Sequence, residues 1–167
     1  MGTWAAAILA TWMGAGAAQP CDPELFRVTR NTNANVVVYE ARLAQPGRID
    51  AKDPVRPVWI MLAEDGRREE LNLVESVMAY GVELQPQDGE GPPVVAIRAM
   101  PELSIRVELE AGCPVARTRI AGRDALLRRV VVEASGGLFP TVAHLDLVGL
   151  ARGTGTEVRE RIVPSDR

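Results

Sequence analysis

The residues with the clearest potential for chemistry are a histidine and an aspartate in the segment "TVAHLDL", residues 141–147. His144 is the only histidine of the chain, and Asp146 follows it by two positions. In a β-strand, side chains two positions apart lie on the same face, with Cα atoms about 7 Å apart. Because an imidazole beside a carboxylate can act as a general base, His144 and Asp146 are weak candidates for a catalytic pair.

The sequence lacks the other parts that an active site of this kind needs. No G-x-S-x-G segment presents a serine nucleophile, and "GTGTE" is not followed by the lysine of a phosphate-binding loop. The two cysteines are far apart, and "EDG" and "QDGE" are too short for a calcium loop. We therefore assign no catalytic residue beyond the weak pair, expect no metal site and no cofactor, and lean against an enzyme.

A second polar group consists of three asparagines, Asn31, Asn33 and Asn35, which directly precede the segment "VVVYEARL". Asparagine adopts turn conformations readily, and its side chain hydrogen-bonds to nearby backbone groups. The simplest interpretation is a bend between two strands. In the alternative interpretation, the amides beside Arg30 form a polar pocket for an anion or a sugar.

The N-terminal segment resembles a secretory signal. Residues 1–20 carry no charged side chain, and an apolar stretch from Trp4 to Met13 is followed by the small residues "GAGAA". We predict a signal peptide over residues 1–18, cleaved after Ala18, and a single β-rich domain over residues 19–167. The protein would then be exported to the bacterial periplasm or the extracellular space. An uncleaved segment would instead tether it to a membrane.

Export would allow the only two cysteines, Cys21 and Cys113, to form a disulfide. Closing a loop of this length would stabilise the fold by about 4 to 5 kcal/mol on the chain-entropy model. Alternatively, Cys21 lies near a loose N-terminus and Cys113, beside Pro114, fills a turn. The sequence leaves both interpretations open.

Composition and charge narrow the class of protein. The chain has 167 residues, of which 47% are hydrophobic and 25% charged, which is enough for one packed core. The formal net charge is −3, and acids alternate with arginines along the chain. Since nucleic-acid binding requires clustered positive charge, we expect no nucleic-acid partner. An envelope protein or a small ligand would fit better, although the sequence identifies neither.

The elements that must position these residues show a two-residue period. In "LSIRVELE", residues 103–110, apolar and polar side chains alternate, as in a half-buried strand. Eight further short segments have similar character and are separated by turns rich in Gly, Pro and Asp. The sequence predicts a mainly β fold, either an antiparallel β-sandwich or a small barrel.

One segment departs from this period. Residues 68–80 place Leu71, Val74 and Met78 at helical spacing, with Val77 nearby and Gly81 following. We predict one amphipathic helix over residues 68–80, inserted after the third strand, with its apolar side on the sheet. Gly81 would end the helix in a left-handed conformation.

The order of several short motifs resembles that of a known family. The segments "RNTNANVVVYEARL", "GRIDAKDPVRPVWIML", "EDGRREELN", "AYG" and "GTGTEVRERIVP" together resemble the bacterial domain of unknown function 4833 family. The resemblance implies a small exported protein and carries over no activity. It singles out the following positions as candidates for ligand binding: Arg30, Asn33, Asn35, Tyr39, Trp59 and Tyr80. It also singles out Gly81, as the helix cap.

Each of these positions also has a structural interpretation. Tyr39 and Trp59 are expected in the core or at a barrel mouth, and Tyr80 is expected to anchor the helix. The sequence therefore favours an uncharacterised exported protein that acts as a non-catalytic binding or scaffold module of the cell envelope. The alternatives are a small hydrolase using His144 and Asp146, and a barrel that binds an apolar ligand in a cavity lined by residues such as Val37, Tyr39 and Trp59.

Overall fold

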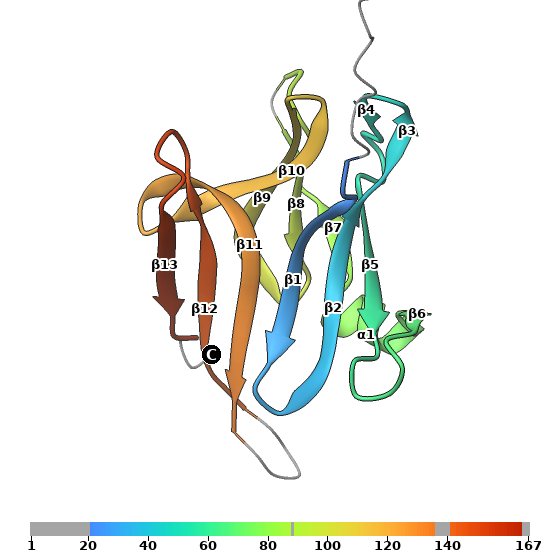
Figure 1. Cartoon of the computed structure of the whole chain (residues 1–167), viewed down its shortest axis with the longest axis vertical. Helices are drawn as coiled ribbons and strands as arrows, with labels where there is room; N and C mark the ends of the chain where they lie inside the picture. The colour runs from blue at the N-terminus through green and yellow to red at the C-terminus, as the bar shows by residue number, and fades with distance from the viewer. Residues whose placement is uncertain (1–20, 88, 136–140, 165–167) are drawn as a thin grey trace, which may run out of the picture.

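A computed structural model describes residues 21–87, 89–135 and 141–164 (Figure 1). The predicted signal peptide, with its cleavage after Ala18, lies outside these residues and stays a prediction. The described part is mainly β with one short helix, which confirms the predicted fold class. The strands are β1 (Glu24–Arg30), β2 (Asn33–Ala41), β3 (Leu43–Gln45), β4 (Arg48–Ile49), β5 (Val55–Ile60), β6 (Arg68–Glu70), β7 (Val82–Leu84), β8 (Val94–Ile97), β9 (Met100–Glu110), β10 (Cys113–Ile120), β11 (Arg123–Ala134), β12 (Val142–Ala151) and β13 (Glu157–Ile162).

Eleven of these strands form one curled sheet, a half-barrel, and β3 and β4 form a separate hairpin. The sheet order is β6-β5-β2-β1-β11-β10-β9-β8-β7, with β12 and β13 continuing from the other edge of β11. Strand β11 pairs with β10 near Leu126 and with β1 near Arg129. Because β10 and β1 diverge from this shared edge, the sheet folds back on itself, as Figure 1 shows.

The central pair of strands differs from the prediction. All strand pairs of the described chain are antiparallel except β1 and β11, which are parallel, with Arg27 opposite Arg129 and Arg30 opposite Val132. A two-residue period identifies strands but carries no information on which strands are neighbours or how they are directed. The expectation of a purely antiparallel sheet was therefore wrong at this pair.

The core lies inside the curl. Alternation in β9 works as predicted, since Leu103, Ile105 and Val107 are buried while Arg106 is exposed. Burying each such apolar side chain contributes roughly 1.5 to 3 kcal/mol relative to leaving it in water. The largest fully buried side chains of the described residues are Tyr39, Phe26, Ile97, Ile105, Ile120, Leu127, Leu147, Val37, Val95, Val107 and Val130.

The helix α1 is shorter than predicted and spans Leu73–Met78. Residues 68–70 form β6, which pairs with β5, so the helix follows a strand that the sequence pattern did not show. A capping box fixes its start, because the side chains of Asn72 and Glu75 each accept the other's backbone N–H. No helical residue is buried, and Leu73 and Met78 are more than 70% exposed. The predicted packing of an apolar helical side on the sheet was therefore wrong.

Gly81 is required at its position for a reason other than the predicted one. It does not adopt a left-handed conformation, and the helix is capped by Ala79. A Cβ atom at position 81 would lie 1.8 Å from the carbonyl oxygen of Ser76. The chain can therefore pass this close to the helix end only if residue 81 lacks a side chain.

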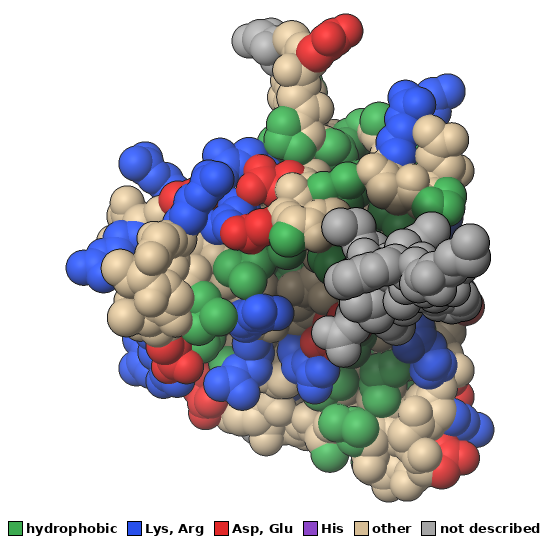
Figure 2. Space-filling model, turned by 45° about the horizontal axis from the view of Figure 1, so that its top comes forward, with side chains coloured by type: hydrophobic (Ala, Val, Ile, Leu, Met, Phe, Trp, Pro, Cys, Tyr) green, Lys and Arg blue, Asp and Glu red, His purple; other side chains and the backbone are tan. Residues whose placement is uncertain are grey.

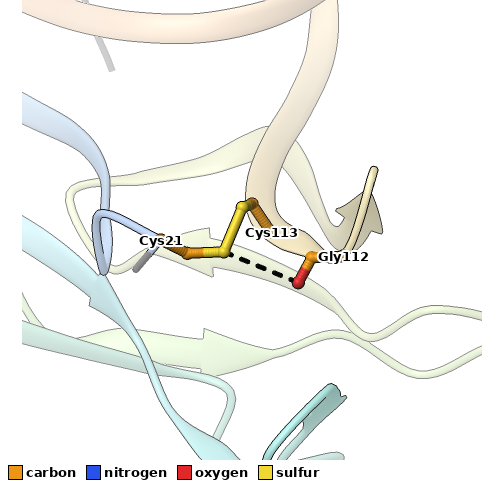
Figure 3. Close-up of a disulfide and its surroundings, with 3 residues drawn as sticks. All are labelled: Cys21, Gly112 and Cys113. Atoms are coloured by element: carbon orange, nitrogen blue, oxygen red, sulfur yellow. Dashed lines mark hydrogen bonds between the residues drawn. A yellow bond between two sulfur atoms is a disulfide. The ribbon is translucent and has the colours of Figure 1, made fainter. Parts of the chain in front are cut away.

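A disulfide joins Cys21, just before β1, to Cys113 at the start of β10 (Figure 3). The Cα atoms are 5.3 Å apart, which is within the usual range for a bridge. The sulfur of Cys21 also lies 3.7 Å from the carbonyl oxygen of Gly112. Of the two interpretations that the sequence allowed, the structure therefore supports the bridge.

Candidate functional site

A cavity of about 440 Å³ lies at the end of β1, between β11, β12 and the turn from β8 to β9. This volume is within the range of small-molecule sites. Its walls are largely apolar, and Arg30, Thr32 and Tyr80 supply the main polar side chains. The apolar lining includes Val28, Ile97, Met100, Val132, Val142 and Leu145.

Arg30 is the cationic group of this cavity. It is the last residue of β1, where pairing with Asn33 and Val132 fixes its backbone on both sides. The guanidinium carbon lies 4.8 Å from the centre of the Tyr80 ring, in cation–π contact. No carboxylate of the described chain forms an ion pair with Arg30. Among the described residues, its charge is therefore not compensated by an acid.

Tyr80 lines the cavity beside Arg30. The residue is only 6% exposed, and its hydroxyl is buried without a hydrogen-bond partner among the described residues. A buried hydroxyl without a partner is unfavourable, since it has lost its hydrogen bonds to water. Because the hydroxyl is enclosed by protein, Tyr80 contributes its ring, and not its hydroxyl, to the cavity.

The backbone around Tyr80 is held firmly. Its N–H donates to the carbonyl of Glu75 at 2.8 Å, and its carbonyl accepts from the Tyr39 hydroxyl at 2.9 Å. The neighbouring carbonyls of Ala79 and Gly81 accept from residues 99 and 98. These bonds position the ring before any ligand arrives, which lowers the entropy cost of binding.

Tyr39 and Trp59 lie behind Tyr80, outside the lining of the cavity. Tyr39 is fully buried and stacks on Phe26, with ring centres 4.5 Å apart, and burial raises the pKa of its phenol well above the ordinary value. The ring centres of Trp59 and Tyr80 are 5.2 Å apart, in an edge-to-face arrangement. The indole N–H of Trp59 donates to the Glu75 carboxylate at 3.1 Å. Both residues therefore support Tyr80. Val37 is packed in the core, so the cavity predicted from Val37, Tyr39 and Trp59 was misplaced.

The asparagines bond to neighbouring backbone. Asn33 accepts from the N–H of Asn35, and Asn35 accepts from the N–H of Ala63, both at 2.9 Å. Asn31 exchanges two hydrogen bonds of 3.0 Å with Ala134 on β11. Asn33 and Asn35 line a separate hollow of about 270 Å³ with Trp59, apart from the Arg30 cavity. Their geometry fits the interpretation as residues that fix a bend.

His144 and Asp146 lie close together but are not arranged for catalysis. His144 Nε2 is 4.0 Å from Asp146 Oδ2, which is too long for a hydrogen bond. Both Asp146 oxygens accept from Arg161, at 2.8 and 3.0 Å, and these bonds lower the pKa of the Asp146 carboxyl. Neither residue lines the Arg30 cavity. The hydrolase alternative gains no support from this geometry.

A second cavity of about 590 Å³ adjoins the first. Met100 and Leu145 line both cavities. One part of the second cavity is apolar, with Leu103, Leu147 and Ile162, and another part carries charged residues around Arg117. On the face shown in Figure 2, hydrophobic side chains surround a central hollow, with arginines and acids interleaved around it. This face therefore carries mixed charge rather than one positive patch.

Arg117 differs from Arg30 because acids surround it. It is 3% exposed, and its guanidinium lies 2.9 Å from Glu108 and 2.5 Å from Glu110, with Asp124 at 4.0 Å. The contact with Glu108 is an ion pair without hydrogen-bond alignment, since Nε is not directed at the carboxylate. The charge of Arg117 is therefore compensated within the protein.

The apolar walls of the first cavity could not have been found from the sequence. Ile97, Met100, Val132 and Leu145 look like ordinary core residues, and they come from four separate strands. Of the residues singled out, Arg30 and Tyr80 line the cavity, while Tyr39 and Trp59 support it from behind. Only the position of these four in the family-like motifs pointed to this region.

Within residues 21–87, 89–135 and 141–164, no three His, Cys, Asp or Glu side chains gather in a way that could hold a metal ion. In the same residues, no helix has the length and apolar character needed to cross a membrane.

Comparison with known proteins gives one result. The model of the family described as Domain of unknown function (DUF4833) matches residues 26–161, which include all residues that line the first cavity except Pro164. No curated protein and no solved structure shows a significant match.

Proposed function

We propose, from the premise that this chain belongs to the family described as Domain of unknown function (DUF4833), that the protein is a non-catalytic binding module for a small amphipathic anion. The family description assigns no activity, so the proposal depends on the cavity itself. Its main support is that the cationic Arg30, in contact with the Tyr80 ring, lines one largely apolar cavity and forms no ion pair among the described residues.

The chemistry of Arg30 indicates the ligand's charged end. A guanidinium binds a carboxylate or a phosphate through parallel hydrogen bonds, and such charge-assisted bonds are stronger than neutral ones. Arg30 is already oriented by its contact with Tyr80. The Tyr80 hydroxyl is enclosed by protein, so Arg30 is the group that would bind the anion.

The apolar walls indicate the rest of the ligand. Burying hydrocarbon against residues such as Val28, Ile97 and Val132 is favourable by about 25 cal/mol per Å². A purely apolar ligand would leave the Arg30 charge without a counterion. A small inorganic anion would leave the apolar side chains of the cavity in contact with water. An amphipathic anion satisfies both parts of the cavity.

We further propose that the protein acts outside the cytoplasm. The Cys21–Cys113 disulfide supports this, since such bridges persist mainly in oxidising compartments. The uncharged N-terminal segment is a second argument for export. A ligand-binding module in the cell envelope would fit both features.

Isothermal titration calorimetry can test the binding proposal. Octanoate, octanol and octylamine share one chain and differ only in the head group. We expect octanoate to bind most tightly, and Arg30→Met to weaken octanoate binding at least tenfold, about 1.4 kcal/mol. Arg128→Met is the matched control, because Arg128 is exposed on β11 and lies outside the cavity lining. Equal binding of the three compounds, or unchanged binding by Arg30→Met, would contradict the proposal.

A further inference from the structure

The two cavities are separated by side chains that belong to both. Met100, at the start of β9, and Leu145, in β12, line each cavity, and both are more than 90% buried. Strands β9 and β12 are not paired with each other, so no backbone ladder joins these two positions. The partition is therefore built, at least in this part, from two flexible apolar side chains.

These side chains are suited to moving aside. Methionine has three rotatable bonds and adapts to irregular spaces, and a leucine can change rotamer at small cost. A slender hydrocarbon chain could pass between them, whereas a ring or a branched group would need a wider opening. The partition therefore selects for ligands with a single unbranched chain.

The second cavity offers a place for the far end of such a chain. Leu103, Leu147 and Ile162 provide apolar walls beyond the partition. Three arginines line the other part of that cavity: Arg117 is paired with Glu108 and Glu110, Arg106 is paired with Asp124, and Arg119 forms no ion pair among the described residues. With the head at Arg30, as in the proposed function, the apolar part of the second cavity is the place left for the tail.

We propose that the ligand is a long single-chain amphiphile with an anionic head, such as a long-chain alkanoate. Its head lies against Arg30 and Tyr80, and its chain passes Met100 and Leu145 into the second cavity. This inference rests on the proposed function, since it names the ligand class of the same site. The second cavity then determines chain length, and the first cavity determines the charge of the head.

A series of unbranched alkanoates tests the length dependence. Octanoate, dodecanoate and hexadecanoate are titrated into the purified full chain below their micellar concentrations, and affinities are measured by calorimetry. Each methylene that enters an apolar wall should raise the affinity by up to about fourfold. We expect the affinity to increase through hexadecanoate, because the second cavity accepts the carbons that the first cannot hold.

A matched pair of variants locates the tail. Ile162→Trp fills the second cavity from the edge strand β13, whereas Val163→Trp adds the same group at the next residue, which is 67% exposed. We expect Ile162→Trp to leave octanoate binding unchanged and to reduce hexadecanoate binding to the octanoate level. Val163→Trp should bind both like the wild type. Circular dichroism and thermal unfolding establish that both variants are folded.

A measurement on the wild type keeps the test independent of the variants. With methyl groups of Ile and Leu labelled by ¹³C, the signals of Ile162 and Leu103 should shift on adding hexadecanoate and stay in place on adding octanoate. If octanoate binds through Arg30 but hexadecanoate binds no more tightly and leaves these methyl signals unchanged, the tail proposal is wrong and the proposed function stands. If no alkanoate binds in an Arg30-dependent way, the proposed function itself fails.

Discussion

The two ends of strand β1 are built in opposite ways. Near its start, the Cys21–Cys113 disulfide ties the chain to β10, and Arg27 is paired with Glu24 at 2.7 Å. At its other end, Arg30 has no carboxylate partner among the described residues, and the nearby Tyr80 hydroxyl has no hydrogen bond. The first end is closed by bonds within the protein. The second leaves polar groups without a partner among the described residues.

The difference separates groups that hold the fold from groups that are available for binding. Arg117 and Asp146 are charged, as Arg30 of the first cavity is, but they form ion pairs with other residues of the chain. They therefore need no counterion from a ligand. Polar groups that are kept near an apolar cavity without a partner are costly to the ligand-free protein. We infer that substitutions near the Cys21–Cys113 disulfide, the closed end of β1, should reduce the free energy of unfolding. Substitution of Arg30, at the open end of β1, should instead reduce the affinity for the ligand.

The largest effect is expected from breaking the closed end. Replacing both cysteines, as Cys21→Ser with Cys113→Ser, removes a bridge across a sequence separation of 92 residues. The chain-entropy model predicts that the free energy of unfolding falls by about 4 to 5 kcal/mol. Urea denaturation with and without reductant measures the change, and octanoate affinity should be preserved in the folded variant. An oxidised wild type no more stable than the double variant would show that the bridge is unimportant.

A smaller loss in the free energy of unfolding is expected at Tyr39, the core residue that supports Tyr80. Tyr39→Phe removes the hydrogen bond to the Tyr80 carbonyl while keeping the stacking on Phe26. We expect the free energy of unfolding to fall by about 1 to 2 kcal/mol, because a carbonyl that was hydrogen-bonded loses its partner. The measurement is again urea denaturation. Phe26→Leu, which removes the stacking and leaves the hydroxyl in place, separates the two contributions.

The opposite sign is expected at the second tyrosine. Tyr80→Phe removes a hydroxyl that has no partner, so the ligand-free protein should become more stable by about 1 kcal/mol. The same variant should bind octanoate as tightly as the wild type, since the buried hydroxyl does not reach the cavity and the ring beside Arg30 is kept. Denaturation and calorimetry on one sample test both statements. A destabilised Tyr80→Phe would indicate that the hydroxyl has a structural role.

The smallest effect is expected at a compensated pair on β12 and β13. The bonds from Arg161 lower the pKa of the Asp146 carboxyl below its ordinary value of 3.8. A depressed folded-state pKa means that this stabilisation is present above the unfolded-state value and is lost as the pH falls through the folded-state value. Asp146→Asn should therefore reduce the acid sensitivity of unfolding in this range without altering octanoate affinity at neutral pH. Acid titrations followed by circular dichroism would show an unchanged curve if the pair contributes nothing.

The fold was predictable from the sequence where the polarity of each residue matches whether it is buried or exposed. Alternation in residues 103–110 predicted the strand correctly, because Leu103, Ile105 and Val107 face the core, although Leu109, expected on the same face, is exposed. The helix was predicted too long, since the spacing of Leu71 and Val74 did not show that residues 68–70 pair with β5. The parallel pairing of β1 with β11 depends on contacts between distant segments, which a local period does not encode.

The candidate site was predictable only in part, for a similar reason. Arg30 and Tyr80 were singled out by the family-like motifs, but their motifs lie far apart in the chain and gave no sign that the two side chains touch. The lack of a carboxylate near Arg30 depends on the packing of several strands. For His144 and Asp146 the local pattern was misleading. Their positions along one strand suggested that they interact, but the Asp146 carboxylate accepts hydrogen bonds from Arg161 on β13.

The parallel pairing of β1 with β11 also constrains the order of folding. Strand β1 can form its hairpin with β2 early, because the two are adjacent in the chain. Its other edge pairs only with residues 129–132, so the centre of the sheet closes after most of the chain has been synthesised. Contacts between such distant segments form slowly, and until then one edge of β1 is open to other strands. The arrangement therefore makes the β1–β2 hairpin the part of the nascent chain most exposed to intermolecular association.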